Sequence, residues 1–123
     1  MGTKYRIMNT LRNSVLLIGL LGADPEFKTL ENGRQMTKFS LATNDFYSNK
    51  NGDKIENTQW HNIVAWGKTA ENMGKLLKKG KKVVIRGKLD YRQYEGKDGT
   101  TRYFTQIVAN EFELFGKPEL VSA

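Results

Sequence analysis

The chain has 123 residues, no cysteine and a formal net charge of +7, with a pI of about 9.7. The length is typical of one domain, and the lack of cysteine excludes disulfides, thiol nucleophiles and cysteine-based zinc sites. The longest apolar run is too short to cross a membrane. A small domain this basic often meets a polyanion, the alternative being a basic surface that only aids solubility.

Apolar periodicity predicts five strands. The first, residues 14–21, is almost continuously apolar, as in a strand buried on both faces. The others are expected at 35–45 after an Asn32-Gly33 turn, at 57–67 after a polar loop at 49–53, at 81–94, and from 101 to about 115 after a flexible hairpin tip at 95–99.

A helix is predicted at 68–79, between the third and fourth strands. Thr69 is suited to cap its start, and Gly80 to adopt the left-handed conformation after its end. Its apolar stripe, which we expect to face the core, consists of Ala70, Met73, Leu76 and Leu77.

The third predicted strand carries two tryptophans on one face. Trp60 and Trp66 lie six residues apart, so a period of two puts both rings on the same side, together with Asn62 and Val64. Large aromatics beside polar residues suit a surface on which nucleic-acid bases stack. The competing interpretation is a core or interface position, since tryptophan also favours half-buried strands.

The fourth predicted strand alternates apolar and basic residues. Val83, Ile85, Leu89 and Tyr91 lie on one face, and Arg86, Lys88, Arg92 and Tyr94 lie on the other. Long strands in this order, with one helix between strands 3 and 4, predict an all-β fold, a five-stranded Greek-key barrel of the oligonucleotide-binding (OB) type. In that fold, the face of strands 2 and 3 takes a strand of nucleic acid.

Several short motifs occur in a specific order along most of the chain. They are Asn13-Ser-Val-Leu-Leu-Ile-Gly19, Leu21-Gly-Ala-Asp-Pro-Glu26, Phe39-Ser-Leu-Ala-Thr43, Thr58-Gln-Trp-His61, Trp66-Gly-Lys68, Leu77-Lys-Lys-Gly80, Val84-Ile-Arg-Gly87 and Arg102-Tyr103. In this order and spacing, residues 12–116 resemble the bacterial and mitochondrial single-stranded DNA-binding proteins. Residues 1–11 are then an N-terminal extension, of which residues 1–7 follow an upstream start or are an expression remnant.

The resemblance implies sequence-independent binding and protection of single-stranded DNA in replication, recombination and repair, in a homotetramer located in the bacterial cytoplasm at the nucleoid. It implies base stacking on Tyr47, Trp60, Trp66 and Tyr94, and a subunit interface near His61, for which a buried packing role is the alternative. Two of the stacking positions often carry tryptophan in the family where this chain has tyrosine. No cofactor, metal or membrane partner is implied.

The resemblance also carries one departure. Family members usually end in a linker and an acidic tip that recruits replication and repair enzymes, whereas residues 117–123 form a short remnant with neither feature. We therefore expect no tail-mediated recruitment by this chain, which is either truncated or a tailless paralogue.

Phosphate neutralisation is assigned to basic residues. The candidates are Arg34, Lys38, Lys68, Lys79, Lys81, Arg86, Lys88 and Arg92; of these, Arg86, Lys88 and Arg92 rank highest, and Lys38 is added because it points outward from the second strand. An enzyme is not expected, because the single histidine lies on the face opposite Trp60 and Trp66, and no P-loop or HExxH pattern occurs. A dimeric adaptor of the primosome type with the same fold is the other alternative.

Overall fold

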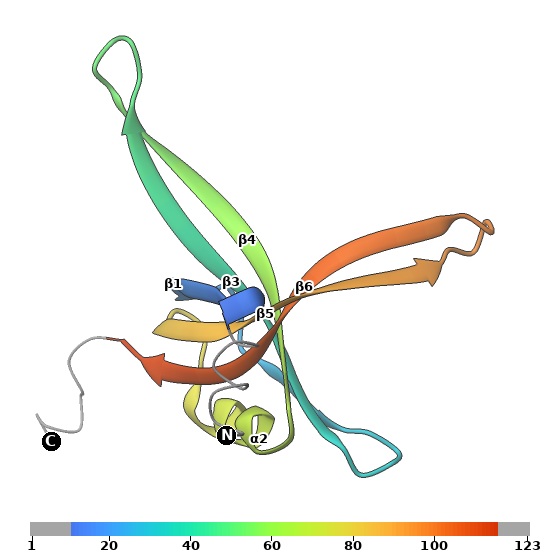
Figure 1. Ribbon diagram of the computed structural model, residues 1–123. Coiled ribbons are helices and arrows are strands. Elements are labelled where there is room, and N and C mark those ends of the chain that lie inside the picture. Colours follow the sequence, from blue (N-terminus) through green and yellow to red (C-terminus); the bar gives the residue numbers. More distant parts are fainter. Residues whose placement is uncertain (1–10, 116–123) are drawn as a thin grey trace, which may run out of the picture.

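The computed structural model describes residues 11–115; most of the N-terminal extension and the C-terminal remnant lie outside this range. The elements in chain order are β1 (Val15–Leu21), β2 (Glu26–Thr29), β3 (Gln35–Ser48), β4 (Lys54–Trp66), α2 (Gly67–Leu76), β5 (Lys82–Glu95) and β6 (Thr101–Leu114). Figure 1 shows a small barrel from which long two-stranded ribbons project.

The sheet closes on itself. Its strand order is β1-β5-β6-β4-β3-β2, and a further pairing of β1 with β3 joins the two ends of the five-stranded part. All neighbours are antiparallel except β4 and β6, which pair in parallel at Ile63 and Ile107. The predicted five-stranded barrel of the OB type is thereby confirmed. The short β2, which pairs only with β3, was not predicted.

Glycines allow the barrel to close where strands pass close together. A side chain on Gly19 of β1 would run into the carbonyl group of Ala42 on β3. One on Gly87 of β5 would run into the carbonyl group of Val108 on β6, at a shift in register between Arg86 and Gly87. Glycine in a strand interior weakens the strand but permits such an approach of two backbones.

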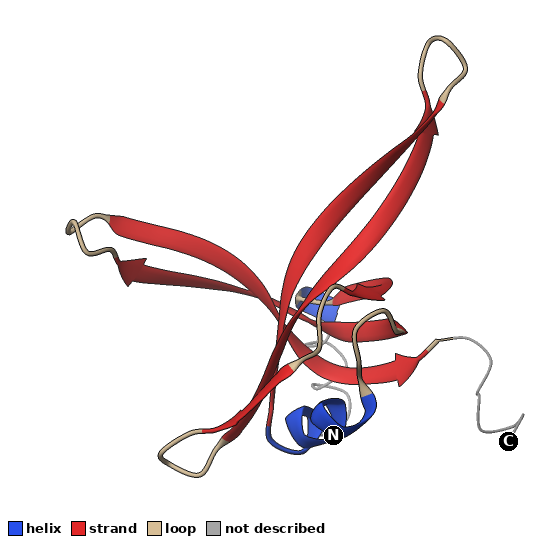
Figure 2. Cartoon of the chain, turned by 180° about the vertical axis from the view of Figure 1, so that it is seen from behind, coloured by secondary structure: helices blue, strands red, loops and turns tan. Residues whose placement is uncertain are grey.

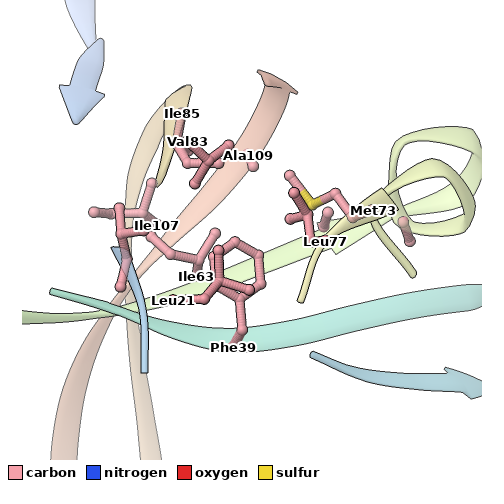
Figure 3. Packing of buried hydrophobic residues seen from close by; sticks show 12 residues of the cluster. Leu21, Phe39, Ile63, Met73, Leu77, Val83, Ile85, Ile107 and Ala109 are labelled. Atoms are coloured by element: carbon pink, nitrogen blue, oxygen red, sulfur yellow. The ribbon is translucent and has the colours of Figure 1, made fainter. Parts of the chain in front are cut away.

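The core lies inside the barrel and follows from strand alternation (Figure 3). Each strand of the closed barrel sends alternate apolar side chains inward, and α2 adds Met73 to the same cluster. Burying a side chain of this size contributes about 1.5–3 kcal/mol. The cluster consists of Leu21, Phe39, Leu41, Ile63, Ala65, Ala70, Met73, Leu77, Val83, Ile85, Ile107 and Ala109.

The ends of α2 differ from the prediction. The helix starts after Trp66, which has an extended backbone, and the Thr69 hydroxyl inside it donates to the Asn110 carbonyl instead of capping the start. The helix ends at Leu76, which is consequently exposed and not part of the core stripe. Gly80 does have a positive φ of 85°, but it belongs to a separate turn, in which the Lys81 amide bonds the Lys78 carbonyl.

Two predicted burial patterns are also wrong. β1 is buried on one face only, because no layer within residues 11–115 covers its outward residues Leu16, Ile18 and Leu20. Tyr91 was expected on the inner face of β5, yet it is 74% exposed, because the strand has left the barrel at that point. The outer halves of β3–β4 and β5–β6 form ribbons that stand away from the core, seen from behind in Figure 2.

A buried hydrogen bond fastens α2 to the barrel. Thr37 of β3 is fully buried, and its hydroxyl donates to the Ala70 carbonyl at 2.6 Å. Replacement of Thr37 by valine keeps the shape and removes this bond, so we expect a loss of about 1 kcal/mol in the free energy of unfolding. Urea denaturation measures it. Thr58→Val removes an exposed bond to Asn44 as the control, and an equal effect of the two variants would contradict the prediction.

Candidate nucleic-acid interface

A groove of about 610 Å³ crosses the outer face of the barrel between the bases of the two long ribbons. The register of the paired strands explains which residues line the groove, because residues opposite each other on neighbouring strands share a face. Met36 opposes Trp66, Lys38 opposes Val64, and Arg92 opposes Phe104. Five residues predicted to bind nucleic acid therefore line one groove, namely Arg34, Lys38, Trp66, Arg92 and Tyr94.

Trp66 stands in this groove with a cation on its ring. The Arg34 guanidinium lies 4.1 Å from the ring centroid, a cation–π contact. Arg34 is held there by the turn before β3, in which its amide bonds the Asn32 side chain and its carbonyl accepts from the Leu30 amide. Arg34, a candidate not ranked among the first by sequence, thus brings charge to the predicted stacking residue.

Tyr94 faces a second ring across the β5–β6 ribbon. Tyr94 and Phe104 meet edge to face, with centroids 6.0 Å apart. Such pairs are favourable beyond the area they bury, so each ring fixes the other at the margin of the groove. Phe104 was not predicted as a site residue; its signal was its place on the outward face of the fifth strand, opposite Arg92.

Arg92 is not an isolated cation. Its Nε donates to Asp90 Oδ2 at 2.8 Å, and the side-chain amide of Gln106 donates to the same oxygen at 2.9 Å. The bond from Gln106, followed by that from Arg92, lowers the pKa of the Asp90 carboxyl below its ordinary value. Asp90 is therefore ionised at neutral pH, beside the cations of the groove.

Trp60 lies farther along β4, on the same face as Trp66, and is 62% exposed. Six residues of strand separate the two tryptophans by about 20 Å. The Trp60 ring rests on Gly22, where a Cβ atom would come within 2.5 Å of ring carbon Cζ3. One side of the indole is thus supported by the chain after β1, and the ring is otherwise open to solvent.

The space between the two tryptophans is also hollowed. A second depression of about 150 Å³ shares Lys38 and Asn62 with the groove. Its lining also includes Ala23, Ser40 and two acidic residues, Asp24 and Glu26. Ala23 directly follows the glycine that supports Trp60. A track therefore runs from Tyr94 past Trp66 and Lys38 toward Trp60, with rings along it and cations beside it.

The remaining predicted residues lie away from the groove. Tyr47 is exposed on the β3–β4 ribbon, on the face opposite to Trp60 by strand alternation, whereas its neighbour Phe46 shares the Trp60 face and carries Lys54 over its ring at 4.3 Å. A stacking role for Tyr47 stays a prediction.

Two basic candidates lie on the barrel part of β5. Lys88 is exposed on the outward face, and Arg86 lines a separate hollow, where its guanidinium is 3.4 Å from the carboxylate of Glu111. That carboxylate would compete with a phosphate for Arg86. The phosphate-binding roles of both residues stay predictions.

His61 points to the other side of β4 from the tryptophans. It is partly buried, and its Nε2 shares a hydrogen bond of 2.9 Å with the Thr43 hydroxyl. This contact is compatible with packing and with an interface. Within residues 11–115, no cluster of acidic or histidine side chains could hold a metal ion, and no helix is long and apolar enough to cross a membrane.

An OB-type barrel with aromatic rings and cations along one outer groove defines a class of nucleic-acid-binding domains. Residues 12–115 match the model of the Single-strand binding protein family, and the chain belongs to this family. It is 45% identical over 104 residues to the single-stranded DNA-binding protein of Neisseria meningitidis and 42% identical over 104 residues to that of Xanthomonas axonopodis. Each alignment covers 85% of this chain, which spans about three fifths of the length of those relatives.

Solved structures agree with the barrel. A deletion mutant of the single-stranded DNA binding protein from Thermus aquaticus superposes with a TM-score of 0.74 at 30% identity, over 85% of this chain and 50% of that one. The Plasmodium falciparum SSB, solved in complex with single-stranded DNA, superposes with a TM-score of 0.72 at 32% identity, over 83% of this chain and 91% of that one.

The support of Trp60 by Gly22 can be tested by fluorescence. A Trp66→Phe background leaves Trp60 as the only tryptophan, since the chain has two. Adding Gly22→Ala should push the ring off its support, because the new methyl group overlaps it. We expect faster quenching by acrylamide. Gly99→Ala adds the same methyl group at the tip of the β5–β6 ribbon. Its positive φ of 84° strains only that turn, so quenching of Trp60 should be unchanged. Unaltered quenching in Gly22→Ala would contradict the contact.

Proposed function

We propose that this chain binds single-stranded DNA without regard to sequence and protects it during replication, recombination and repair. Support comes from the track between Trp60 and Tyr94, which combines open rings with cations on one face. The names of its relatives agree with this proposal. No catalytic step is part of it: the chain acts as a passive binder.

Stacking accounts for the choice of single strands. Every base has a π-face, so Trp60, Trp66 and Tyr94 accept any sequence, each contributing about 1–3 kcal/mol per stacked base. A duplex hides these faces between its own base pairs. The same rings therefore give broad tolerance among sequences together with rejection of double strands.

Cations account for the rest of the affinity. Arg34, Lys38 and Arg92 line the groove beside the rings, and each phosphate they neutralise releases counterions from the nucleic acid. This part of the binding free energy depends on salt and not on sequence. We assign Lys88 and Arg86 a supporting role outside the groove.

We further propose that the chain forms a homotetramer in which β1 contributes to an interface. The outward residues Leu16, Ile18 and Leu20 are 59%, 46% and 39% exposed. Among the described strands, β1 pairs with β3 only at Leu20 and Leu21, so one edge of the strand has no partner from Val15 to Gly19. An apolar strand with an open edge is suited to cover by another copy. His61 is the other interface candidate.

The stacking model is tested by titrating the chain with oligo-dT, using tryptophan fluorescence for the wild type and the anisotropy of a labelled strand for variants. We expect quenching by the single strand and not by a duplex of equal length. The logarithm of the binding constant should fall with the logarithm of salt by about 0.7 per phosphate neutralised. Trp60→Ala should cost about 1–3 kcal/mol for every sequence.

Tyr103→Ala is the matched control for this test. Tyr103 is 73% exposed but lies on the opposite face of the β5–β6 ribbon from Tyr94 and Phe104, so its removal should change affinity less than about two-fold. Equal losses of affinity in Trp60→Ala and Tyr103→Ala would contradict the proposed binding along the track. Absence of quenching, or equal binding to duplex, would favour a protein-binding adaptor.

The interface is tested by light scattering on the wild type, for which we expect a mass of four times the 14.0 kDa chain. Ile18→Glu should lower that mass, because a carboxylate on the apolar face of β1 cannot be buried without a partner. Leu76→Glu places the same charge on an exposed apolar position of α2 and should leave the mass unchanged. A tetramer that survives Ile18→Glu would exclude this face.

A further inference from the structure

An acidic residue, Asp90, is bonded to two residues that line the groove, and the proposed DNA binding does not explain it. Asp90 is on the outward side of β5, opposite Gln106 and two residues before Arg92. Its carboxylate accepts from both of these residues, and both bonds end on the same oxygen, Oδ2. The resulting cluster joins two strands of the ribbon at the base of the groove.

Asp90 and its two partners differ in their access to the groove. Arg92 and Gln106 line it, whereas Asp90 lies behind them with its side chain only 25% exposed. Because the Asp90 bond uses Nε of Arg92, the two Nη groups are left as donors for a ligand. Because Gln106 turns its amide nitrogen to Asp90, its carbonyl oxygen is left as an acceptor.

We propose that Asp90 is a positioning residue for single-stranded DNA: it fixes Arg92 and Gln106 so that one presents donors and the other an acceptor to the strand. The proposal rests on the function proposed above. A free arginine side chain loses much rotamer entropy when it binds a phosphate. Held by Asp90, Arg92 has lost most of that freedom before DNA arrives, so each bond it forms to the strand costs less.

Simple electrostatics predicts the opposite effect. A carboxylate near a phosphate repels it, and removing it should strengthen binding by up to about five-fold for two charges about 4 Å apart in water. Positioning therefore predicts a change in affinity opposite to that expected from charge alone. Loss of the acidic residue should weaken the complex with the strand. This difference in sign makes the proposal testable on the intact chain.

The experiment compares the binding of a labelled oligo-dT strand to the wild type, Asp90→Ala and Asp90→Asn across a series of salt concentrations. We expect Asp90→Ala to weaken binding about five-fold and to reduce the salt slope, by at most about 0.7, since Arg92 no longer holds a phosphate reliably. Asp90→Asn keeps an oxygen that can accept from Arg92, so its affinity for the strand should lie between those of the wild type and Asp90→Ala. Thermal unfolding confirms that each variant is folded, and Asp90→Asn decides the result if the alanine variant is not.

Two controls separate positioning from charge. Glu95→Ala removes the same charge from the opposite face of β5 and should not weaken binding. In a background that carries both Arg92→Ala and Gln106→Ala, Asp90→Ala should cause no further loss, because both residues through which it acts are gone. Equal or tighter binding by Asp90→Ala with a steeper salt slope would overturn the positioning role and leave the proposed function intact. A wild type that binds no single strand would overturn both.

Discussion

The close passage of β1 over β3 is the constraint on which the rest of the structure depends. Gly19 permits it, because any side chain there would collide with the carbonyl group of Ala42. Closure places Leu21 and Leu41 side by side in the core and gives the inner face of the sheet its own apolar filling. The outer faces of β3 and β4 are therefore not needed to fill this core, and polar and aromatic residues can occupy them.

The strands are longer than the barrel needs, and this excess creates the proposed binding surface. Each of β3, β5 and β6 has 14 residues, of which only part contacts the core. Beyond that part, both faces of each ribbon meet solvent, so rings such as Tyr94 and Phe46 are exposed although they lie in regular strands. Pairing along each ribbon keeps these rings at fixed spacing, which a loop of equal length would not do.

Much of this could be predicted from the sequence, because alternation in long strands is a strong signal. The barrel and the groove residues Trp66, Arg92 and Lys38 follow from a period of two, and the helix position follows from the period of about 3.6 residues in its apolar stripe. Burial on both faces of β1 was wrongly predicted because an apolar run does not reveal whether a second layer covers it. The cluster of Asp90 with Gln106 could not be foreseen, since it depends on the register between two strands, and a one-residue shift separates the pair.

Charge and stacking contribute in different ways to the proposed binding at this face. The chain carries a net charge of +7, yet the groove itself holds three cations, one of them paired with Asp90 and one placed over Trp66. Cations held in this way neutralise phosphate at defined points instead of forming a diffuse positive field, which salt would screen within about 10 Å. Stacking of bases on the rings is not screened by salt. For the proposed binding of single strands, fixed cations between the rings therefore predict a weaker dependence of affinity on salt than the net charge suggests, together with the preference for unpaired bases that stacking provides.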